Sequence, residues 1–188
     1  KTCSRRAFGA RSLATLGAVA LASATTGAWA EDLENTLYLD LSYGRVVIQL
    51  RPDKAPKTVA RIKELARQHF YDGTPFHRVI ADFMAQGGDP TGTGTGGSGK
   101  TLPAEFSDLK HERGTVSMAR SSDPNSADSQ FFICFAPAPY LDGQYTAFGQ
   151  VIEGMEFVDR IKKGDASNNG LVMVPDRVVK MRVAADGE

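Results

Sequence analysis

The segment Phe76-His77-Arg78-Val79-Ile80 contains the side chains with the clearest capacity for chemistry. Because side chains alternate between the two faces of a strand, His77 and Arg78 should point in opposite directions, and one of them should face apolar neighbours. A guanidinium held among apolar side chains is costly unless it has a partner or a task. Arg78 is therefore a candidate functional residue, and the alternative is a structural salt bridge.

Other reactive groups give little indication of catalysis. The three histidines, His69, His77 and His111, lie far apart, and no spacing of His, Cys and carboxylates predicts a metal site. The chain has no Gly-x-Ser-x-Gly sequence of the kind that carries a hydrolase nucleophile. Cys134 lies in the apolar run 131–135, which predicts a buried, unreactive thiol. We expect neither a metal nor a cofactor.

The segment 94–101, Gly-Thr-Gly-Gly-Ser-Gly-Lys-Thr, has the spacing of a nucleotide-binding phosphate loop. Such a loop needs a buried strand before it and a helix after it, whose N-terminus faces the phosphates. Here glycines, threonines and a proline precede Gly94, and Pro103 interrupts the residues after the loop. The segment is therefore interpreted as a flexible glycine-rich loop and not as a nucleotide site.

The first 30 residues have the layout of an export signal. They include four basic residues and no acidic residue, and no charge occurs between Ser12 and Ala30. Ala28-Trp29-Ala30 fits the small-x-small rule for signal cleavage, and Ala22-Ser23-Ala24 is a second candidate. The segment 4–8, Ser-Arg-Arg-Ala-Phe, resembles the twin-arginine export motif. The alternative is a membrane anchor, against which the Ala, Gly, Ser and Thr content argues.

Cleavage after Ala30 would leave one domain, residues 31–188. Of the 22 basic and 22 acidic residues, four basic ones lie in the signal, so this domain has 18 basic and 22 acidic residues and a net charge of −4. That balance predicts no nucleic-acid partner. Cys3 is removed with the signal, so Cys134 has no partner for an intramolecular disulfide. We expect a periplasmic protein without stable membrane association after cleavage.

The rest of the pattern predicts many short strands and two helices. Runs 36–41 and 45–50 flank Ser42-Tyr43-Gly44 and predict a hairpin. Residues 56–68, opened by Asp53 and Pro56, and residues 155–162 have helical periodicity. Further strands are expected at 76–80, 83–86, 114–119, 130–135, 146–151 and 177–183. This content is mainly β and indicates a compact barrel or sandwich with helical lids.

Several separated motifs identify a family resemblance. The segment 71–89, YDGTPFHRVIADFMAQGGD, resembles the signature of the cyclophilins, which are peptidyl-prolyl cis–trans isomerases. The segments Ser117–Arg120, Ser129–Ile133, Leu141–Gly143 and Phe148-Gly149 occur in family order at suitable spacing. The likeness covers nearly all of 36–183 and is greatest to bacterial exported cyclophilins.

The resemblance implies an eight-stranded closed antiparallel β-barrel capped by two α-helices, with a substrate groove on its outer face. It implies that Arg78 is the catalytic residue. The apolar pocket for the substrate proline would consist of Phe83, Met84, Phe132 and Leu141. Gln86, Gln130 and the backbone near Ala119 and Arg120 would hold the peptide on the N-terminal side of the proline.

Four features depart from the common eukaryotic pattern of the family. Tyr140 stands where a Trp associated with cyclosporin affinity is usual, and Tyr145 stands in place of a groove His. Arg120 replaces a common Asn, and the loop 121–128 is one residue longer. Tyr140 and Tyr145 are included among the expected substrate-binding residues.

The resulting functional prediction is a monomeric peptidyl-prolyl cis–trans isomerase that acts on proline-containing segments of exported proteins while they fold. X–Pro rotation makes and breaks no covalent bond, so it needs no nucleophile. An arginine can stabilise the twisted amide instead. The alternative is a non-catalytic chaperone module that binds proline-containing segments without turnover.

Overall fold

The computed structural model describes residues 1–2 and 32–187. The predicted export signal therefore lies, apart from its first two residues, outside the described part of the chain. Within the described part, no helix combines the length and the apolar character needed to cross a membrane.

Eight antiparallel strands form one sheet, which confirms the mainly β prediction. They are β1 (Thr36–Leu41), β2 (Gly44–Leu50), β3 (Arg78–Ile80), β4 (Met84–Gly87), β5 (Thr115–Met118), β6 (Phe131–Cys134), β7 (Ala147–Glu153) and β8 (Lys180–Val183). Their spatial order is β3-β4-β6-β5-β7-β2-β1-β8. The expected hairpin joins β1 and β2, with Leu41 opposite Gly44.

The closure of the sheet is less regular than expected, because no strand ladder joins β3 to β8 among the described residues. The segments that precede these two strands make backbone hydrogen bonds instead. Gly73 N–H donates to Val178 O at 2.8 Å, Val178 N–H donates to Thr74 O at 3.0 Å, and Phe76 N–H donates to Asp176 O at 2.9 Å. The sheet is therefore a curled barrel whose seam is closed by irregular backbone.

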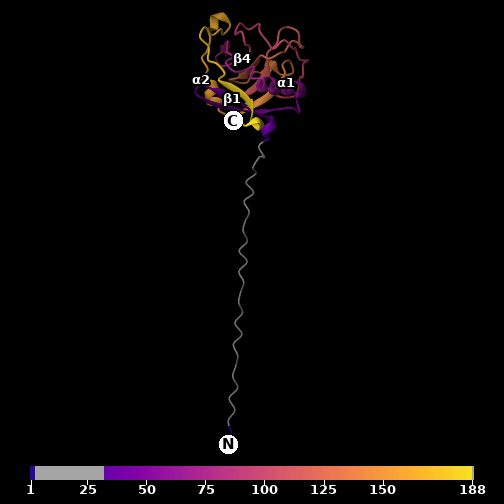
Figure 1. Ribbon diagram of the computed structural model, residues 1–188, viewed down its shortest axis with the longest axis vertical. Helices are drawn as coiled ribbons and strands as arrows, with labels where there is room; N and C mark the ends of the chain where they lie inside the picture. Colours follow the sequence, from indigo (N-terminus) through magenta and orange to yellow (C-terminus); the bar gives the residue numbers. More distant parts are fainter. Residues whose placement is uncertain (3–31, 188) are drawn as a thin grey trace. The chain divides into compact units, whose positions relative to one another are not determined.

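Two helices cover the sheet, and Figure 1 shows them on either side of β1. Helix α1 (Pro56–Arg67) packs against β8, and α2 (Met155–Arg160) packs against β2. The apolar face expected for α1 is buried at Val59, Ile62, Leu65 and Ala66. Ala55 offers this helix no side-chain cap, so the Glu105 carboxylate accepts hydrogen bonds from its first backbone amides, those of Lys57 and Thr58.

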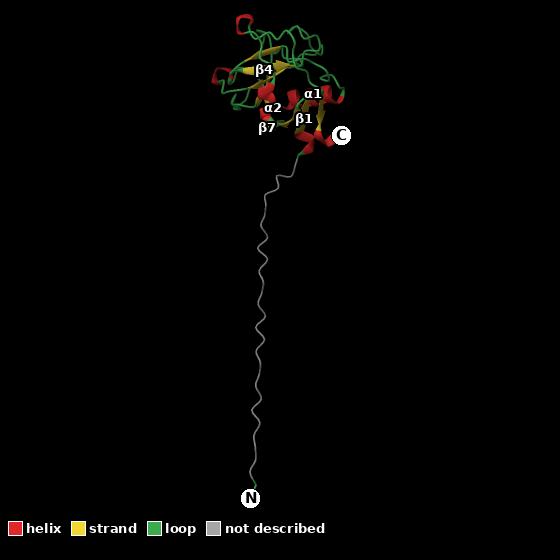
Figure 2. Ribbon diagram, turned by 90° about the vertical axis from the view of Figure 1, so that its left-hand side faces the viewer, coloured by secondary structure: helices red, strands yellow, loops and turns green. Residues whose placement is uncertain are grey.

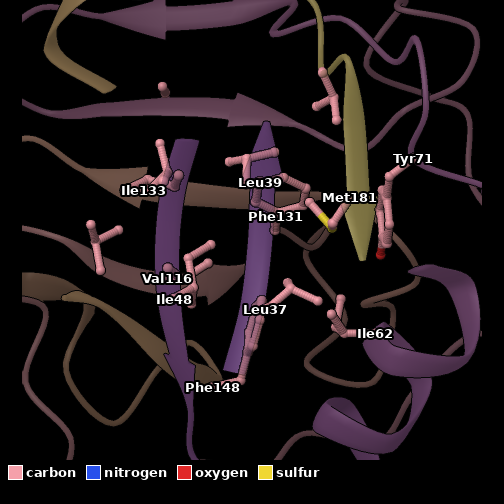
Figure 3. Packing of buried hydrophobic residues seen from close by; sticks show 14 of the residues in the cluster. Leu37, Leu39, Ile48, Ile62, Tyr71, Val116, Phe131, Ile133, Phe148 and Met181 are labelled. Atoms are coloured by element: carbon pink, nitrogen blue, oxygen red, sulfur yellow. The ribbon is translucent and has the colours of Figure 1, made fainter. Parts of the chain in front are cut away.

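The main core lies between the sheet and these helices. Leu37 and Leu39 of β1 lie beside Met181 of β8, with Ile48 on the neighbouring β2 and Ile62 on α1 (Figure 3). Figure 2 shows how much of the remaining chain consists of loops, which connect the short strands.

Strands β5 and β6 are buried on both faces, and β4 is buried except at the half-buried Gln86. On β6, Phe131 and Ile133 belong to the main core, whereas Phe132 and Cys134 belong to a second apolar cluster. The same alternation on β4 places Ala85 in the core and Met84 in the second cluster. The fold therefore supports an apolar cluster on the outer side of the barrel wall.

A pair of glycine substitutions tests how tightly the strand connections pack. Gly154 and Gly143 both have left-handed φ angles, of +80° and +68°. A Cβ at Gly154 would overlap the carbonyl oxygen of Arg45, whereas a Cβ at Gly143 would meet nothing within 4 Å. We expect Gly154→Ala to lower the free energy of unfolding by about 1–3 kcal/mol more than Gly143→Ala. Urea denaturation measures both, and equal losses would contradict the prediction.

Candidate active site

Arg78 lies on the outer side of the barrel, and its guanidinium is held by neutral acceptors. Nη1 donates to Gln86 Oε1 at 3.0 Å, Nε donates to Asn169 O at 3.1 Å, and Nη2 donates to Asn169 Oδ1 at 2.9 Å. Its neighbour His77 is the side chain that points inward and is buried. Within the described residues Arg78 forms no ion pair, so the salt-bridge alternative is wrong.

The hydrogen bonds from Arg78 continue through two glutamines into the glycine-rich loop. Gln86 Nε2 donates to Gln130 Oε1 at 2.9 Å. Gln130 Nε2 donates to the carbonyl oxygens of Gly94 and Gly96, at 3.0 and 2.9 Å. The orientation of each side chain thus fixes that of the next, from Asn169 to the loop.

Two carboxylates hold the glycine-rich loop in place. Asp89 is fully buried and accepts hydrogen bonds from the amides of Thr91, Gly94 and Gly96. Asp128 accepts hydrogen bonds from the amides of Ser98 and Gly99. The hydrogen bonds lower the pKa of Asp89 although its burial acts in the opposite direction. Because carboxylates occupy the amides that a phosphate would need, this geometry supports the rejection of a nucleotide site.

Arg78 borders an apolar pocket of about 410 Å³. The pocket also contains Phe83, Met84, Gln86, Ala119, Arg120, Phe132, Tyr140, Leu141, Gln144 and Tyr145. Met84, Phe132 and Leu141 are buried and form its floor within the second apolar cluster. An aliphatic ring fits such a pocket because apolar side chains form its floor while two cations, Arg78 and Arg120, lie at its rim.

Three side chains shape the rim of this pocket. The Tyr145 ring meets the Phe132 ring edge to face, with centroids 6.0 Å apart. The Arg120 guanidinium lies over the Tyr145 ring, 4.5 Å from its centroid, and also donates to Gln144 O. Tyr140 is 62% exposed and its ring lies 5.8 Å from that of Phe83. The Arg120 side chain therefore holds the Tyr145 ring in position.

A second hollow of about 380 Å³ adjoins the first. Both hollows include Gln86, Ala119 and Arg120 in their walls, and the second extends over the glycine-rich loop to Thr101 and Asp128. Gln130 lies in this second hollow. Because they share three wall residues, the two hollows form one groove.

Behind the pocket, the buried His111 ring contacts residues of two of the pocket's walls. The imidazole stacks on the Phe132 ring at a centroid distance of 6.1 Å. Its Nδ1 lies 3.1 Å from Asp142 Oδ1, and its Nε2 lies 3.0 Å from Ser117 Oγ. Asp142 directly follows Leu141, so this one buried ring positions residues on both sides of the pocket. Burial lowers the pKa of His111, while Asp142 acts in the opposite direction.

Cys134 takes no part in the groove surface. The thiol is buried, and burial raises its pKa to about 12. The prediction of a buried cysteine is confirmed, and since the thiolate is the reactive form, low reactivity stays the expectation. No group of His, Cys, Asp or Glu side chains in the described range is arranged to hold a metal ion.

The structure brings all eleven predicted site residues into the two hollows. Sequence reasoning missed Asn169, which holds Arg78, as well as Gln144 and His111. Asn169 has a φ of +51°, which asparagine tolerates better than most residues. No sequence signal links it to Arg78, because the two residues are 91 positions apart. The assigned roles in binding and catalysis stay predictions.

Comparisons with known proteins all identify one family of isomerases. Residues 36–183 match the family model of the cyclophilin type peptidyl-prolyl cis-trans isomerase/CLD. A probable peptidyl-prolyl cis-trans isomerase of Brucella suis is 50% identical over 184 residues, which cover 92% of this chain and 91% of the relative. A peptidyl-prolyl cis-trans isomerase of Helicobacter pylori is 43% identical over 141 residues, or 72% of this chain and 86% of the relative.

Solved structures show the same likeness. A cyclophilin from Hirschia baltica has a TM-score of 0.74 at 27% identity, covering 84% of this chain and 76% of the other. A cyclophilin type isomerase from Cryptosporidium parvum, crystallised in the presence of the dipeptide Ala-Pro, has a TM-score of 0.72 at 31% identity. That match covers 79% of this chain and 98% of the other.

The buried histidines generate a prediction about stability. Burial lowers the pKa of both His77 and His111 from 6.5, so the native state binds fewer protons than the unfolded state as the pH falls below 6.5. The free energy of unfolding should therefore be largest above pH 6.5 and fall as the pH drops from 6.5 toward the lowered native pKa values.

Urea denaturation at pH 7.5 and 5.5 measures this loss of stability, to which each buried histidine should contribute. His111→Gln should reduce the pH dependence. Equal stability of the wild type at both pH values would refute the assignment.

Proposed function

The chain belongs to the cyclophilin-type peptidyl-prolyl cis–trans isomerases, and we propose that it accelerates X–Pro rotation in exported proteins as they fold, with Arg78 stabilising the twisted amide. The observation that carries this mechanism is a half-buried guanidinium at the rim of an apolar pocket, held by neutral acceptors.

The pocket fits the pyrrolidine ring of a proline. Phe83, Met84, Phe132 and Leu141 supply apolar walls, and Tyr145 closes one side. Gln86 and Gln130, with the backbone around Ala119 and Arg120, border the adjoining hollow, where the residues before the proline would lie. Binding in this way fixes the peptide on one side of the X–Pro bond while the other side stays free to rotate.

Arg78 can act on the bond because part of its guanidinium remains available. An arginine has five N–H donors, and residues in the described part of the chain use three of them. When the X–Pro bond twists, the nitrogen loses its resonance with the carbonyl and becomes a better hydrogen-bond acceptor. An N–H directed at that nitrogen stabilises the transition state more than the planar ground state.

The magnitudes agree with such a mechanism. Uncatalysed X–Pro rotation takes about 10–100 s. Shortening this time to milliseconds requires a rate increase of about four powers of ten. The activation free energy must then fall by about 5.5 kcal/mol, at ~1.36 kcal/mol for each power of ten. A hydrogen bond from a charged group supplies about 1.5–3 kcal/mol. Transfer of the polar planar amide into the dry pocket would supply much of the remainder, because the twisted amide is less polar.

The charge on Arg78 persists throughout the working pH range. Burial lowers the pKa of Arg78, but its ordinary value lies far above neutrality, and Tyr145 acts in the opposite direction. The mechanism has no step in which a side chain gains or loses a proton. Activity should consequently be nearly independent of pH around neutrality.

The proposed location rests on residues 1–30, whose basic start, uncharged middle and small-residue end are typical of an export signal. Clients would then be unfolded segments that have just crossed the inner membrane. The proposed partners are proline-containing polypeptides, and the proposed working form is a monomer.

The variant Asn169→Gly tests how Arg78 is positioned. Glycine preserves the left-handed backbone and the carbonyl acceptor but removes the Oδ1 acceptor of Arg78 Nη2. We expect kcat for cis-to-trans isomerisation of an Ala-Ala-Pro-Phe peptide to fall about threefold to tenfold, with KM within about twofold, since one neutral acceptor is lost.

The neighbouring variant Asn168→Gly serves as the matched control and should retain wild-type kcat. An unchanged kcat in Asn169→Gly would refute the positioning role. Failure of the folded wild type to accelerate the peptide would refute the catalytic proposal and favour the non-catalytic binding module.

A further inference from the structure

A third hollow lies beside the peptide groove, between α1 and the end of the glycine-rich loop. Its volume is about 380 Å³, and its walls include Lys57, Arg61 and Glu64 of α1 together with Lys100 and Thr101. Thr101 also lines the second hollow of the groove. This third hollow, the basic hollow, therefore borders the groove at Thr101.

The charges in the basic hollow are unbalanced. It contains three cations, Lys57, Arg61 and Lys100, and one carboxylate, Glu64. Arg61 uses that carboxylate, because Nη1 donates to Glu64 Oε2 at 2.8 Å while Nη2 donates to Ser98 Oγ. The hydrogen bond from Arg61 lowers the pKa of Glu64, and Lys100 adds a smaller effect in the same direction. Glu64 is thus ionised and already paired.

The two lysines remain available to a ligand. Both are exposed, and within the part of the chain that the structure describes neither forms an ion pair. The Arg61 side chain is only 10% exposed, and its Nε has no hydrogen-bond partner among the described residues. Two exposed lysines beside the largely buried Arg61 offer a carboxylate more than one cationic partner.

We propose that the basic hollow binds an acidic side chain of the client polypeptide, located on the N-terminal side of the X–Pro bond. This inference rests on the proposed function and extends its groove. A peptide that crosses the second hollow away from the proline pocket would reach Thr101, which lines both the second hollow and the basic hollow. The acidic residue would then lie about four to six positions before the proline.

The inference also gives a role to Lys100, which a phosphate-loop interpretation would have assigned to nucleotides. Residues 31–188 have a net charge of −4, so the domain as a whole repels acidic peptides. A preference for them must therefore arise from a local surface. Sequence pattern alone cannot reveal this surface, because Lys57 and Lys100 meet only in the fold.

Two peptide pairs test the proposal with the full protein. In the first pair, two Glu residues or two Gln residues stand five and four positions before the proline of an otherwise identical peptide. In the second pair, the same residues stand after the proline. We expect kcat/KM for the Glu peptide of the first pair to exceed that of its Gln partner about twofold to fivefold per acidic residue at low salt. The advantage should shrink at about 0.5 M salt.

Variants test whether the two lysines of the basic hollow cause the preference for the Glu peptide. The double variant Lys57→Gln/Lys100→Gln should lose the advantage and isomerise the Gln peptide at the wild-type rate. Lys162→Gln, which removes an exposed lysine far along the sequence, should retain the advantage. The second pair should show no preference for Glu.

Three results would overturn the proposal. They are equal kcat/KM for the two peptides of the first pair, a Glu preference that persists in the double variant, and a preference of the same size when the acidic residues come after the proline. Failure of the protein to isomerise even the Gln peptides would instead refute the proposed function, so the two failures are distinguishable.

Discussion

The site depends on how one guanidinium is held. Three N–H groups of Arg78 donate to amide and carbonyl oxygens of Gln86 and Asn169, and no carboxylate of the described residues pairs with it. A carboxylate would fix the side chain equally well, but it would also neutralise the guanidinium charge. Its two oxygens would accept hydrogen bonds from two guanidinium N–H groups at once. Neutral acceptors fix the orientation of the guanidinium and leave its charge unpaired and two of its N–H groups unused by the described residues. Gln86 and Gln130 continue these hydrogen bonds from Arg78 to the glycine-rich loop, so the side chains along the groove also hold one another in position.

The second requirement is a barrel wall that is apolar on both faces. Because β4 and β6 alternate, Phe131 and Ile133 stabilise the barrel while Phe132 and Met84 form the floor of the pocket. The pocket therefore needs no separate scaffold, since the strands that make the core also make the site. His111 completes the arrangement from behind, where its hydrogen bonds to Asp142 and Ser117 connect the wall with the segment that carries Leu141.

Much of this could be predicted from sequence, and the remainder has identifiable physical reasons. Alternation and periodicity predicted the β1–β2 hairpin and the apolar face of α1, and the family motifs brought together the eleven site residues. Asn169 was missed because its contact with Arg78 spans 91 positions and depends on a left-handed backbone in a loop. The prediction of a closed barrel did not anticipate that irregular segments, such as 73–76 and 176–178, link its two edge strands. Hydrogen bonds between such segments leave no periodic pattern in the sequence. Glu105, which caps α1, was missed for the same reason.

The most direct test of the central claim separates binding from rotation in Arg78→Ala. Two-dimensional NMR exchange spectroscopy on a proline peptide measures both the dissociation constant and the rate of isomerisation on the protein. If Arg78 acts on the twisted amide, kcat should fall about tenfold to a hundredfold while the peptide dissociation constant stays within about threefold, in a variant that retains the wild-type amide spectrum outside the groove. An isomerisation rate within about twofold of wild type would contradict the account, as would a loss that lies wholly in binding.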